Sequence, residues 1–304
     1  MKKSVIEVQA VSRQFGDILA VDNVDLTIVQ GEIFGLIGHN GAGKSTLLKM
    51  MLGLLPPTQG EIRINGESVR GARFRQVRRR IAYLPENIVF YENLSGLETL
   101  MFFARLKDAG RHTCLPLLEK VGLGTAARRP VRGYSKGMRQ RLGFAQALLG
   151  EPDLLFLDEP TTGLDPEATR DFYRILKELK EQGITAILSS HHLAEIQGHL
   201  DRLALMKRGR IQAAGTVQSL RDALKLPLHI QVDLRNGAEP ALRTALQGVV
   251  GCEVSMLADS ARIVCARDEK INVLTRLTHL QDAILDIQLQ EPSLEDVFLG
   301  YAEV

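Results

Sequence analysis

The sequence predicts an α/β protein with a parallel sheet at its centre and a smaller α+β domain after it. A glycine-rich segment, residues 36–46, lies between an apolar run at 32–37 and a stretch of helical spacing from Ser45 to about Leu52. Further apolar runs end at 157 and at 188, and continuous apolar runs are typical of strands buried in a parallel sheet. Beyond Pro227 the pattern restarts as strand, helix, hairpin, helix and strand, the order of a ferredoxin-like domain.

Length and composition limit the class of protein. The 304 residues suit one large domain, expected at 1–222, and a small one, expected at 223–304. The net charge of +2 gives no global field that favours nucleic acid. The basic cluster from Arg70 to Arg80 has no aromatic platform, so we interpret it as a solvated helix face and expect no nucleic-acid partner. No apolar run approaches the roughly 20 residues that span a bilayer, so we expect a soluble, cytoplasmic chain.

Two further subdomains are predicted around the glycine-rich segment. Residues 5–11 and 21–29 alternate like half-exposed strands, and the strand pattern resumes at 61–64 after a proline-rich break. These segments predict an antiparallel β subdomain. Apolar residues at helical spacing between 94 and 123, and a later helix that ends near Leu149, predict a helical subdomain over about 87–150.

The glycine-rich segment has the spacing of a phosphate-binding loop, with Gly38 and Gly43 placed before Lys44 and Ser45. Glycines let successive backbone N–H groups turn toward a polyphosphate, and the following helix points its positive end at the same anion. Lys44 is expected to reach the outer phosphates, and the Ser45 hydroxyl is a hard oxygen ligand suited to Mg²⁺. The alternative is a turn before an ordinary helix, which the preceding buried strand disfavours.

Polar residues follow the next buried strands, at the edge where open α/β sheets place their ligands. Asp158 is expected to face the magnesium held by Ser45, and Glu159 a water in line with the terminal phosphate. A helix cap is the alternative for Asp158 alone. His191, in a place where surface or capping roles are usual, gains a site role from its convergence with two carboxylates. Phe15, beside the first turn, can offer a stacking face to a purine, although packing is its commoner role.

Five ordered motifs resemble those of the ABC transporter ATPase subunits over about residues 4–220. They are the phosphate loop, the signature loop Tyr134-Ser135-Lys136-Gly137-Met138, Asp158-Glu159, Gly163-Leu164-Asp165 and Ser190-His191. The resemblance implies a P-loop ABC ATPase fold and a head-to-tail homodimer. In that dimer each ATP, with Mg²⁺, is clamped between the phosphate loop of one copy and the signature loop of the other. It also implies ATP hydrolysis coupled to a polytopic membrane permease.

The same resemblance implies roles for single residues. Ser135 and Gly137 serve the nucleotide of the partner copy, and Asp165 shapes the dimer seam. His191 contacts the terminal phosphate, and Glu159 polarises the attacking water. Adenine stacking and the phosphate contacts come from Phe15 and from the loop residues Gly38, His39, Asn40, Gly41, Ala42, Gly43, Lys44, Ser45 and Thr46.

Two departures from the commoner family pattern matter. The signature loop reads Tyr-Ser-Lys-Gly-Met rather than Leu-Ser-Gly-Gly-Gln, but it keeps the serine and second glycine that face phosphate, so its chemistry should survive. Glu86 stands where most members carry a glutamine that senses Mg²⁺. A carboxylate about 4 Å from a phosphate charge costs roughly 4 kcal/mol at an effective dielectric of 20, unless metal lies between them. Glu86 should therefore contact magnesium or swing away, and the sequence leaves both open.

A narrower set of segments resembles the NosF branch of the family, the ATPases that support copper-site assembly of periplasmic nitrous oxide reductase. The set comprises 38–40, 83–87 with 90–91, 94–100 and 134–142. It implies a NosY-like permease, an indirect periplasmic partner like the copper-handling NosD, and a peripheral place at the cytoplasmic face of the inner membrane. The alternatives are exporters of drugs, sodium or polysaccharide, and a non-transport ABC ATPase, which a single cassette without sustained heptads disfavours. A GTP switch is disfavoured because an Asn-Lys-x-Asp motif is missing.

The tail resembles accessory domains that look like dimerisation or regulatory elements in related exporters. With a two-residue hairpin turn, Cys252 would lie opposite Cys265, and Met256 would share their face. Val254 and Ile263 share it too, so buried reduced cysteines are a better interpretation than a soft-metal site, and we expect no copper there. The three cysteines show no C-x-x-C spacing, which argues against zinc and against a disulfide framework.

Overall fold

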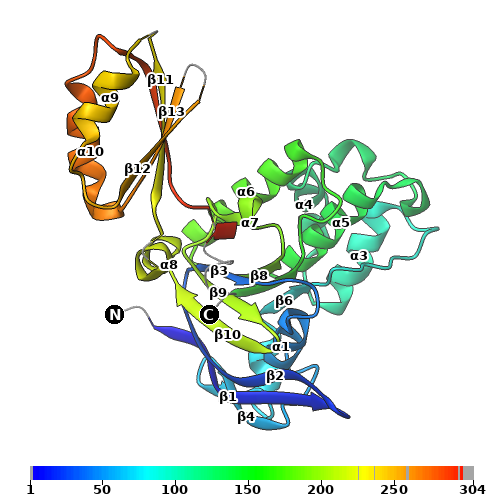
Figure 1. The fold of residues 1–304 in the computed structure, drawn as a ribbon. Helices are drawn as coiled ribbons and strands as arrows, with labels where there is room; N and C mark the ends of the chain where they lie inside the picture. Colours follow the sequence, from blue (N-terminus) through cyan, green and yellow to red (C-terminus); the bar gives the residue numbers. More distant parts are fainter. Residues whose placement is uncertain (1–2, 225, 236, 258–259, 294, 297–304) are drawn as a thin grey trace. The chain divides into compact units, whose positions relative to one another are not determined.

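The computed structural model describes residues 3–224, 226–235, 237–257, 260–293 and 295–296. The chain divides into two compact units, Met1–Thr216 and Val217–Val304. Helix α8 (Val217–Leu224) belongs to the second unit, so the division lies slightly before the boundary expected at 222/223. Each unit has its own hydrophobic core, and we describe each by itself (Figure 1).

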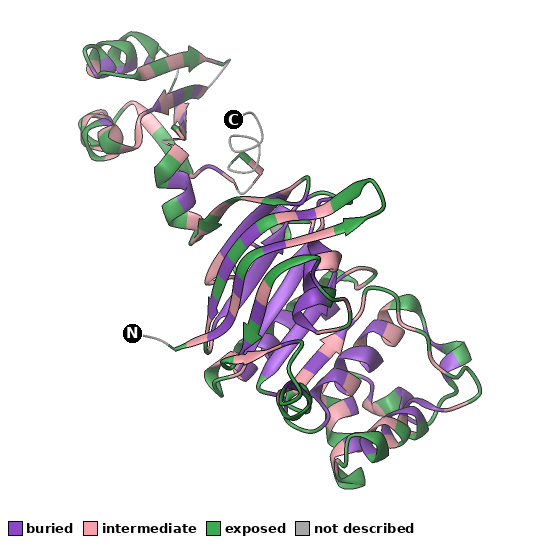
Figure 2. Ribbon diagram, turned by 90° about the horizontal axis from the view of Figure 1, so that it is seen from below, coloured by how far each residue is buried: buried purple, intermediate pink, exposed green. Residues whose placement is uncertain are grey.

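A six-stranded sheet, in the order β10-β9-β3-β8-β7-β6, forms the centre of the first unit. Its strands are β3 (Ile33–Ile37), β6 (Ile81–Leu84), β7 (Leu154–Asp158), β8 (Thr185–Ser190), β9 (Arg202–Lys207) and β10 (Arg210–Gly215). Neighbours pair in parallel, except that β10 runs antiparallel to β9. Every residue of β3, β7 and β8 is buried, as the purple strands of Figure 2 show, which explains their mostly apolar sequences. The predicted parallel sheet is confirmed.

A second, antiparallel sheet has the order β2-β1-β4-β5. Its strands are β1 (Ser4–Phe15), β2 (Ile18–Val29), β4 (Gln59–Ile64) and β5 (Glu67–Ser68). Helix α1 (Lys44–Met51) lies between the two sheets, because Leu47 and Met50 share one core with Ile28 of β2 and Phe156 of β7. The short helix α2 (Phe74–Arg78) then leads into β6, and its arginines are exposed. The predicted antiparallel subdomain is therefore present.

Helices form the rest of the first unit. The predicted helical subdomain consists of α3 (Gly96–Leu106), α4 (Cys114–Lys120) and α5 (Lys136–Leu148), while α6 (Pro166–Glu181) and α7 (Leu193–Ile196) follow β7 and β8. Ser95 and Glu98 form a capping box at the start of α3. Lys107, just after α3, donates from Nζ to carbonyl oxygens at the end of α5, that of Leu149 at 3.1 Å. Within the described residues, no helix is long and apolar enough to cross a bilayer.

The second unit carries a four-stranded antiparallel sheet in the order β12-β13-β11-β14. After α8, its elements are β11 (Leu228–Leu234), α9 (Glu239–Leu246), β12 (Cys252–Met256), β13 (Ser260–Cys265), α10 (Lys270–Thr278) and β14 (Ile284–Gln290). This is the element order of the split β-α-β fold that the sequence predicts. Both α9 and α10 cover one face of the sheet, where Leu242 and Val273 pack with Ile230 (Figure 1).

The two cysteines of the hairpin lie as expected. Cys252 pairs with Cys265 in the register of β12 and β13, and Val254 pairs with Ile263. The turn expected at Ala258-Asp259 lies outside the described residues. Both thiols are free, and burial raises the pKa of each, which disfavours the thiolate form that binds metal ions. That copper does not bind here stays a prediction.

Candidate functional site

The register of the central sheet brings three strand ends together. β3 pairs with β8 so that Ile37 lies opposite Ser190, and β7 pairs with β8 so that Asp158 lies opposite Ser189. The phosphate loop, the second carboxylate and the histidine each follow directly on one of these strands. Three motifs that are distant in sequence therefore meet at the carboxyl edge of the sheet, where open α/β sheets bind ligands.

Backbone geometry explains the glycines of the loop. Gly41 and Gly43 have φ angles of 81° and 104°, a region that residues with side chains rarely adopt. A Cβ on Gly38 would meet the carbonyl oxygen of Met206 at 2.3 Å, and one on Gly43 would meet that of Ala20 at 2.4 Å. The loop is thus bare backbone packed between β9 and β2 and followed by the positive end of α1, an arrangement that suits phosphate.

Lys44 is buried where the loop becomes α1. Its ammonium group donates to the carbonyl oxygens of Gly38 (2.5 Å) and His39 (3.3 Å) and lies 3.6 Å from Oε1 of Glu159. Burial lowers the pKa of Lys44, and the carboxylate of Glu159 opposes that shift. The carbonyl groups of the loop therefore hold a cation at the edge of the cleft, and that it reaches the outer phosphates stays a prediction.

Two hydroxyl groups hold Asp158. Ser45 Oγ donates to Asp158 Oδ1 at 3.1 Å, and Ser189 Oγ donates to the same oxygen at 2.6 Å. Ser189 also accepts a hydrogen bond from the backbone N–H of Glu159 at 3.0 Å. Sequence reasoning did not single out Ser189. The available signal was a polar residue that remains inside a buried strand, just before the strand leaves the sheet.

Glu159 combines an uncommon backbone conformation with an oxygen that lacks a partner. Its φ is 48°, and 6% of the residue is exposed. Within the described residues, Oε1 makes no hydrogen bond, although Lys44 is near. Oε2 lies 2.9 Å from Nδ1 of His191, but the two atoms are not aligned for a hydrogen bond. A buried carboxylate with free acceptor capacity can take a hydrogen bond from water.

Lys44, Ser45 and Glu159 border an open cleft of about 620 Å³, whereas Asp158 and His191 are not among its lining residues. Its lining comprises residues 40–46, Glu86, Glu159 and five residues that sequence reasoning did not assign: Ile18, Leu19, Ala20, Arg208 and Gly209. The first three follow the β1–β2 turn, and the last two form the β9–β10 turn. They reach the cleft because the two sheets pack around α1, which no local pattern in the sequence predicts.

Glu86 faces the cleft, and Phe15 is not among its lining residues. Burial is the largest cause that raises the pKa of Tyr83 to about 12, and the charges of Asp158 and Glu86 add to it. Phe15 lies exposed at the end of β1, with the guanidinium of Arg13 4.5 Å from its ring centroid. Adenine stacking on Phe15 therefore stays a prediction.

The signature-loop residues lie elsewhere. Ser135 is the N-cap of α5, and its Oγ accepts from the N–H of Met138 at 3.2 Å. Asp165 is the N-cap of α6, and its Oδ1 accepts from the N–H of Ala168 at 2.8 Å. Ser135 and Asp165 are exposed, and neither they nor Gly137 line the cleft of their own chain.

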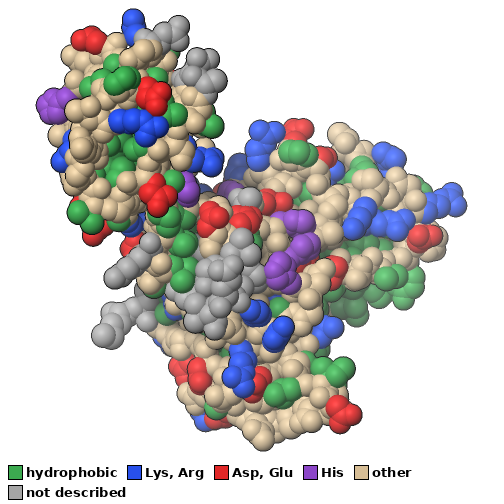
Figure 3. Space-filling view, viewed as in Figure 1, with side chains coloured by type: hydrophobic (Ala, Val, Ile, Leu, Met, Phe, Trp, Pro, Cys, Tyr) green, Lys and Arg blue, Asp and Glu red, His purple; other side chains and the backbone are tan. Residues whose placement is uncertain are grey.

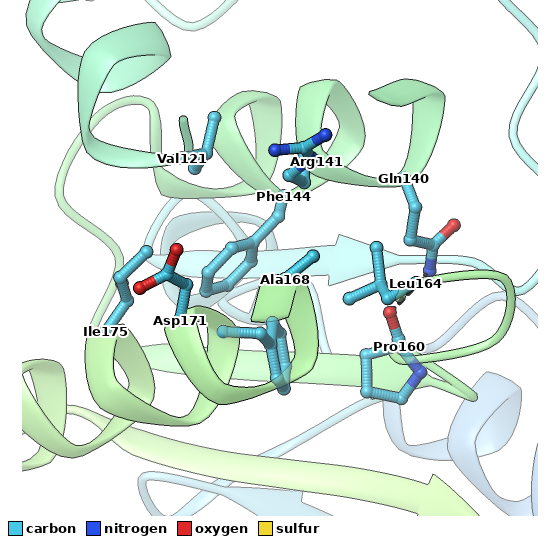
Figure 4. A pocket seen from close by; sticks show the side chains of 10 residues that line it. Val121, Gln140, Arg141, Phe144, Pro160, Leu164, Ala168, Asp171 and Ile175 are labelled. Atoms are coloured by element: carbon cyan, nitrogen blue, oxygen red, sulfur yellow. Dashed lines mark hydrogen bonds between the residues drawn. The ribbon is translucent and has the colours of Figure 1, made fainter. Parts of the chain in front are cut away.

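Helix α5 is tied to the segment that follows Glu159. The buried amide of Gln140 donates from Nε2 to the carbonyl oxygen of Pro160 at 2.9 Å. Figure 4 shows Gln140 and Pro160 at one end of a small cavity that side chains of α5 and α6 line. The volume of this cavity is about 10 Å³. The cavity has room for about one water molecule, so its residues pack the two helices together rather than bind a ligand.

The phosphate loop follows β3 at the carboxyl edge of a parallel sheet, and two carboxylates lie at the end of β7, which β8 separates from β3. This arrangement defines a P-loop nucleoside triphosphatase. Residues 21–162 match the family model described as ABC transporter. The chain is 34% identical to the daunorubicin resistance ATP-binding protein DrrA3 of Streptomyces coeruleorubidus, over 98% of this chain and 96% of that protein. It is 31% identical to the linearmycin resistance ATP-binding protein LnrL of Bacillus subtilis (strain 168), over 97% of both. The chain belongs to the ABC transporter ATP-binding subunits.

Solved structures agree with this assignment. An ATP-binding subunit of an ABC transporter matches with a TM-score of 0.67 and 34% identity, covering 72% of this chain and 92% of that one. A dimeric post-hydrolysis state of the cassette MJ0796, bound to ADP and Pi, matches with a TM-score of 0.65 and 26% identity, covering 70% and 98%. The protein is an ABC ATPase that binds and hydrolyses ATP.

Proposed function

We propose that this ATPase drives a membrane exporter of the drug- and antibiotic-resistance type. The observation that carries the proposal is likeness to resistance ATPases along nearly the whole chain, the second unit included. DrrA of Streptomyces peucetius, named for daunorubicin and doxorubicin resistance, is a further relative, 35% identical over 97% of this chain. The proposed partner is a polytopic permease, with the ATPase bound peripherally at the cytoplasmic face of the membrane.

Two copies are proposed to close head-to-tail on two ATP molecules. Ser135 and Gly137 would complete the nucleotide site of the partner copy, with Asp165 at the same seam. Support comes from their position outside the cleft of their own chain, at the positive end of the 13-residue helix α5. Gln140 joins α5 to Pro160, the residue after Glu159. A shift of α5 when a phosphate docks on it would therefore move the segment that carries this carboxylate.

Within each site, Glu159 is proposed to orient and polarise the attacking water through its unpaired Oε1. Lys44 neutralises charge on the outer phosphates, and His191, which lies beside Oε2 of Glu159, contacts the terminal phosphate. Hydrolysis transfers the terminal phosphate of ATP to water, and once inorganic phosphate leaves the site, the negative charge that holds the two copies together is reduced and the dimer opens.

Magnesium fits the oxygen donors beside the loop. Ser45 Oγ and Asp158 Oδ1 lie 3.1 Å apart, and both are the hard ligands that Mg²⁺ prefers. We propose that they hold the ion and that Glu86 contacts it, directly or through water, since Glu86 lines the same cleft. When bound, the ion would neutralise charge on the phosphates and relieve the repulsion between them and Glu86.

The permease is proposed to dock on an exposed apolar surface formed by α3 and by the segment that joins β6 to α3. Val89, Tyr91, Phe102 and Leu106 are 89, 63, 40 and 69% exposed. The rings of Tyr91 and Phe102 meet edge to face, 6.0 Å between centroids, and hydrophobic side chains gather over α3 in Figure 3. Exposed apolar patches of this kind mark protein contacts. The segment that joins β6 to α3 also contains Glu86, which lines the cleft, so this segment connects the docking surface to the cleft.

A narrower candidate is copper-site assembly of nitrous oxide reductase, with a NosY-like permease and NosD as an indirect partner. Its support is the resemblance of four segments of the sequence to the NosF branch. The relatives named above carry resistance names, and for that reason we prefer the resistance exporter.

One experiment separates these proposals. Cells of the source organism receive wild-type protein, Lys44→Ala, or the control Arg75→Ala on the exposed face of α2. For a resistance exporter, Lys44→Ala alone should raise the sensitivity to cytotoxic compounds and leave the copper centres of nitrous oxide reductase intact. Loss of the copper spectrum from an enzyme that is still exported would favour the narrower candidate. No change in either readout would contradict both and favour a non-transport ABC ATPase.

A further inference from the structure

The turn between β9 and β10 holds an arginine in a backbone conformation that does not suit it. Lys207 pairs with Arg210, which leaves Arg208 and Gly209 as a two-residue turn with φ angles of 49° and 81°. Two left-handed residues make a type I′ turn, whose first position favours Asn, Asp or Gly. Arginine gives no local advantage there, so its side chain is the feature to explain.

The turn is fixed to the phosphate loop. The N–H of Gly209 donates to the carbonyl oxygen of Ala42 at 2.9 Å, and the N–H of Asp22 donates to that of Gly209 at 2.9 Å. A Cβ on Gly209 would meet the carbonyl oxygen of Ala20 at 3.0 Å. The backbone of Arg208 therefore keeps a constant position relative to the loop that receives the phosphates.

Arg208 presents an uncompensated positive charge to the cleft. It is exposed, lines the cleft, and makes no hydrogen bond or ion pair within the described part of the chain. Arg210, two residues later, instead pairs with Asp22 at 2.6 Å. The other cation of the lining, Lys44, is held by carbonyl groups of the loop and faces Glu159. The two cations thus belong to different elements of the lining, the β9–β10 turn and the start of α1.

The surroundings of Arg208 indicate which part of the nucleotide it meets. Its turn packs on Ala20 and Ala42, beside Ile18 and Leu19, which give that wall an apolar surface. Lys44 and Glu159 belong to other elements of the lining, the start of α1 and the residue after β7, and Glu159 is the proposed partner of the water that attacks the terminal phosphate. An apolar wall next to a free guanidinium suits the nucleoside end, with its base and its first phosphate.

We propose that Arg208 binds the phosphate nearest the nucleoside in both ATP and ADP, and so sets nucleotide affinity without taking part in hydrolysis. The proposal rests on the ATP site and not on the identity of the exporter. The guanidinium of Arg208 loses contacts with water when the nucleotide binds, and charge-assisted hydrogen bonds to a phosphate oxygen replace them.

The test measures the dissociation constants of ATP and ADP for the purified full chain by calorimetry. Arg208→Asn places the residue that the turn favours, so the nucleotide-free protein should melt at the same temperature or higher, while both dissociation constants rise about tenfold. Arg208→Lys should give a smaller rise. Arg75→Asn removes an equal charge from α2, outside the cleft, and should change neither constant.

Three results would overturn the proposal: unchanged affinity in Arg208→Asn, a loss confined to ATP, or an equal loss in Arg75→Asn. A loss confined to ATP would put the arginine at the terminal phosphate instead. Failure of the wild-type chain to bind either nucleotide would contradict the ATP site itself, which separates the two levels of inference.

Discussion

The two units of the chain differ in what they bury. The first unit buries Lys44, Asp158 and Glu159 side by side at one edge of its sheet. In the described part of the second unit, the core consists of aliphatic side chains with Cys265, and the buried charged residue is Arg221 of α8. Burying charges costs free energy unless each finds a partner. The charged site of the first unit therefore costs stability, whereas the core of the second unit adds it through packing. Mutations in the first site should mainly change activity, and mutations in the second core should mainly change stability.

The largest expected effect is on hydrolysis alone. Glu159→Gln keeps the size of the side chain but removes the basic oxygen that is proposed to polarise water. Turnover of ATP should fall by about 10²–10⁴, while ATP binding persists. Steady-state turnover and equilibrium binding, measured on the same preparation, check this. Normal turnover would refute the role of Glu159.

Packing in the second unit should respond to a cavity. Ile230→Ala removes a fully buried side chain between β11 and its two helices, at a cost of about 2–5 kcal/mol. We expect calorimetry to show a lower melting temperature for the second unit, with ATP affinity of the first unit unchanged. Gln231→Ala, on the half-exposed side of the same strand, is the control. A loss of ATP affinity in Ile230→Ala would show that the two units are coupled.

A smaller effect should come from the contact between α5 and the catalytic segment. Gln140→Leu leaves the carbonyl oxygen of Pro160 without its partner, which costs about 1–3 kcal/mol. Urea unfolding of the first unit should report this, and turnover should fall because Glu159 is no longer held firmly. The control is Gln146→Leu, whose side chain makes no hydrogen bond within the described residues. Equal behaviour of the two variants would remove Gln140 from the mechanism.

The smallest expected effect depends on pH. Burial lowers the pKa of Lys44 in the folded chain, so between this value and 10.5 the unfolded chain binds more protons and stability rises with pH. Without nucleotide, Lys44→Met should be more stable than wild type at neutral pH, and the difference should shrink as the pH is raised toward 10.5. Lys49→Met, exposed on the same helix, should show no such trend. A difference that grows with pH would contradict the assigned direction.

How far the sequence predicts each part depends on the range of the signal. The phosphate loop, the strand carrying Asp158 and the β-α-β-β-α-β tail are local patterns, and the structure bears them out. The sequence predicts the turn at Arg208-Gly209 and the strand that ends near Ser189, but it does not assign Ser189 or Arg208 to the site, because their importance depends on which strands become neighbours. The sequence places Phe15 beside a turn and predicts a stacking role for it. Where the ring lies relative to the cleft depends on how the β1–β2 hairpin packs. Short sequence motifs therefore predict the residues that carry the chemistry, whereas residues that two packed sheets bring to the lining of a site are not predicted.

Strand order also bears on how the cassette is made. β3, which carries the phosphate loop, lies between β8 and β9, and both of these follow it by some 150 residues or more in the chain. At about 5–20 residues per second, β3 leaves the ribosome on the order of ten to thirty seconds before its second neighbour. During that interval its edges have no strand to pair with and invite association with other chains. A nascent chain therefore exposes both edges of β3 for that time, and the lining of the cleft is complete only once the β9–β10 turn has been synthesised.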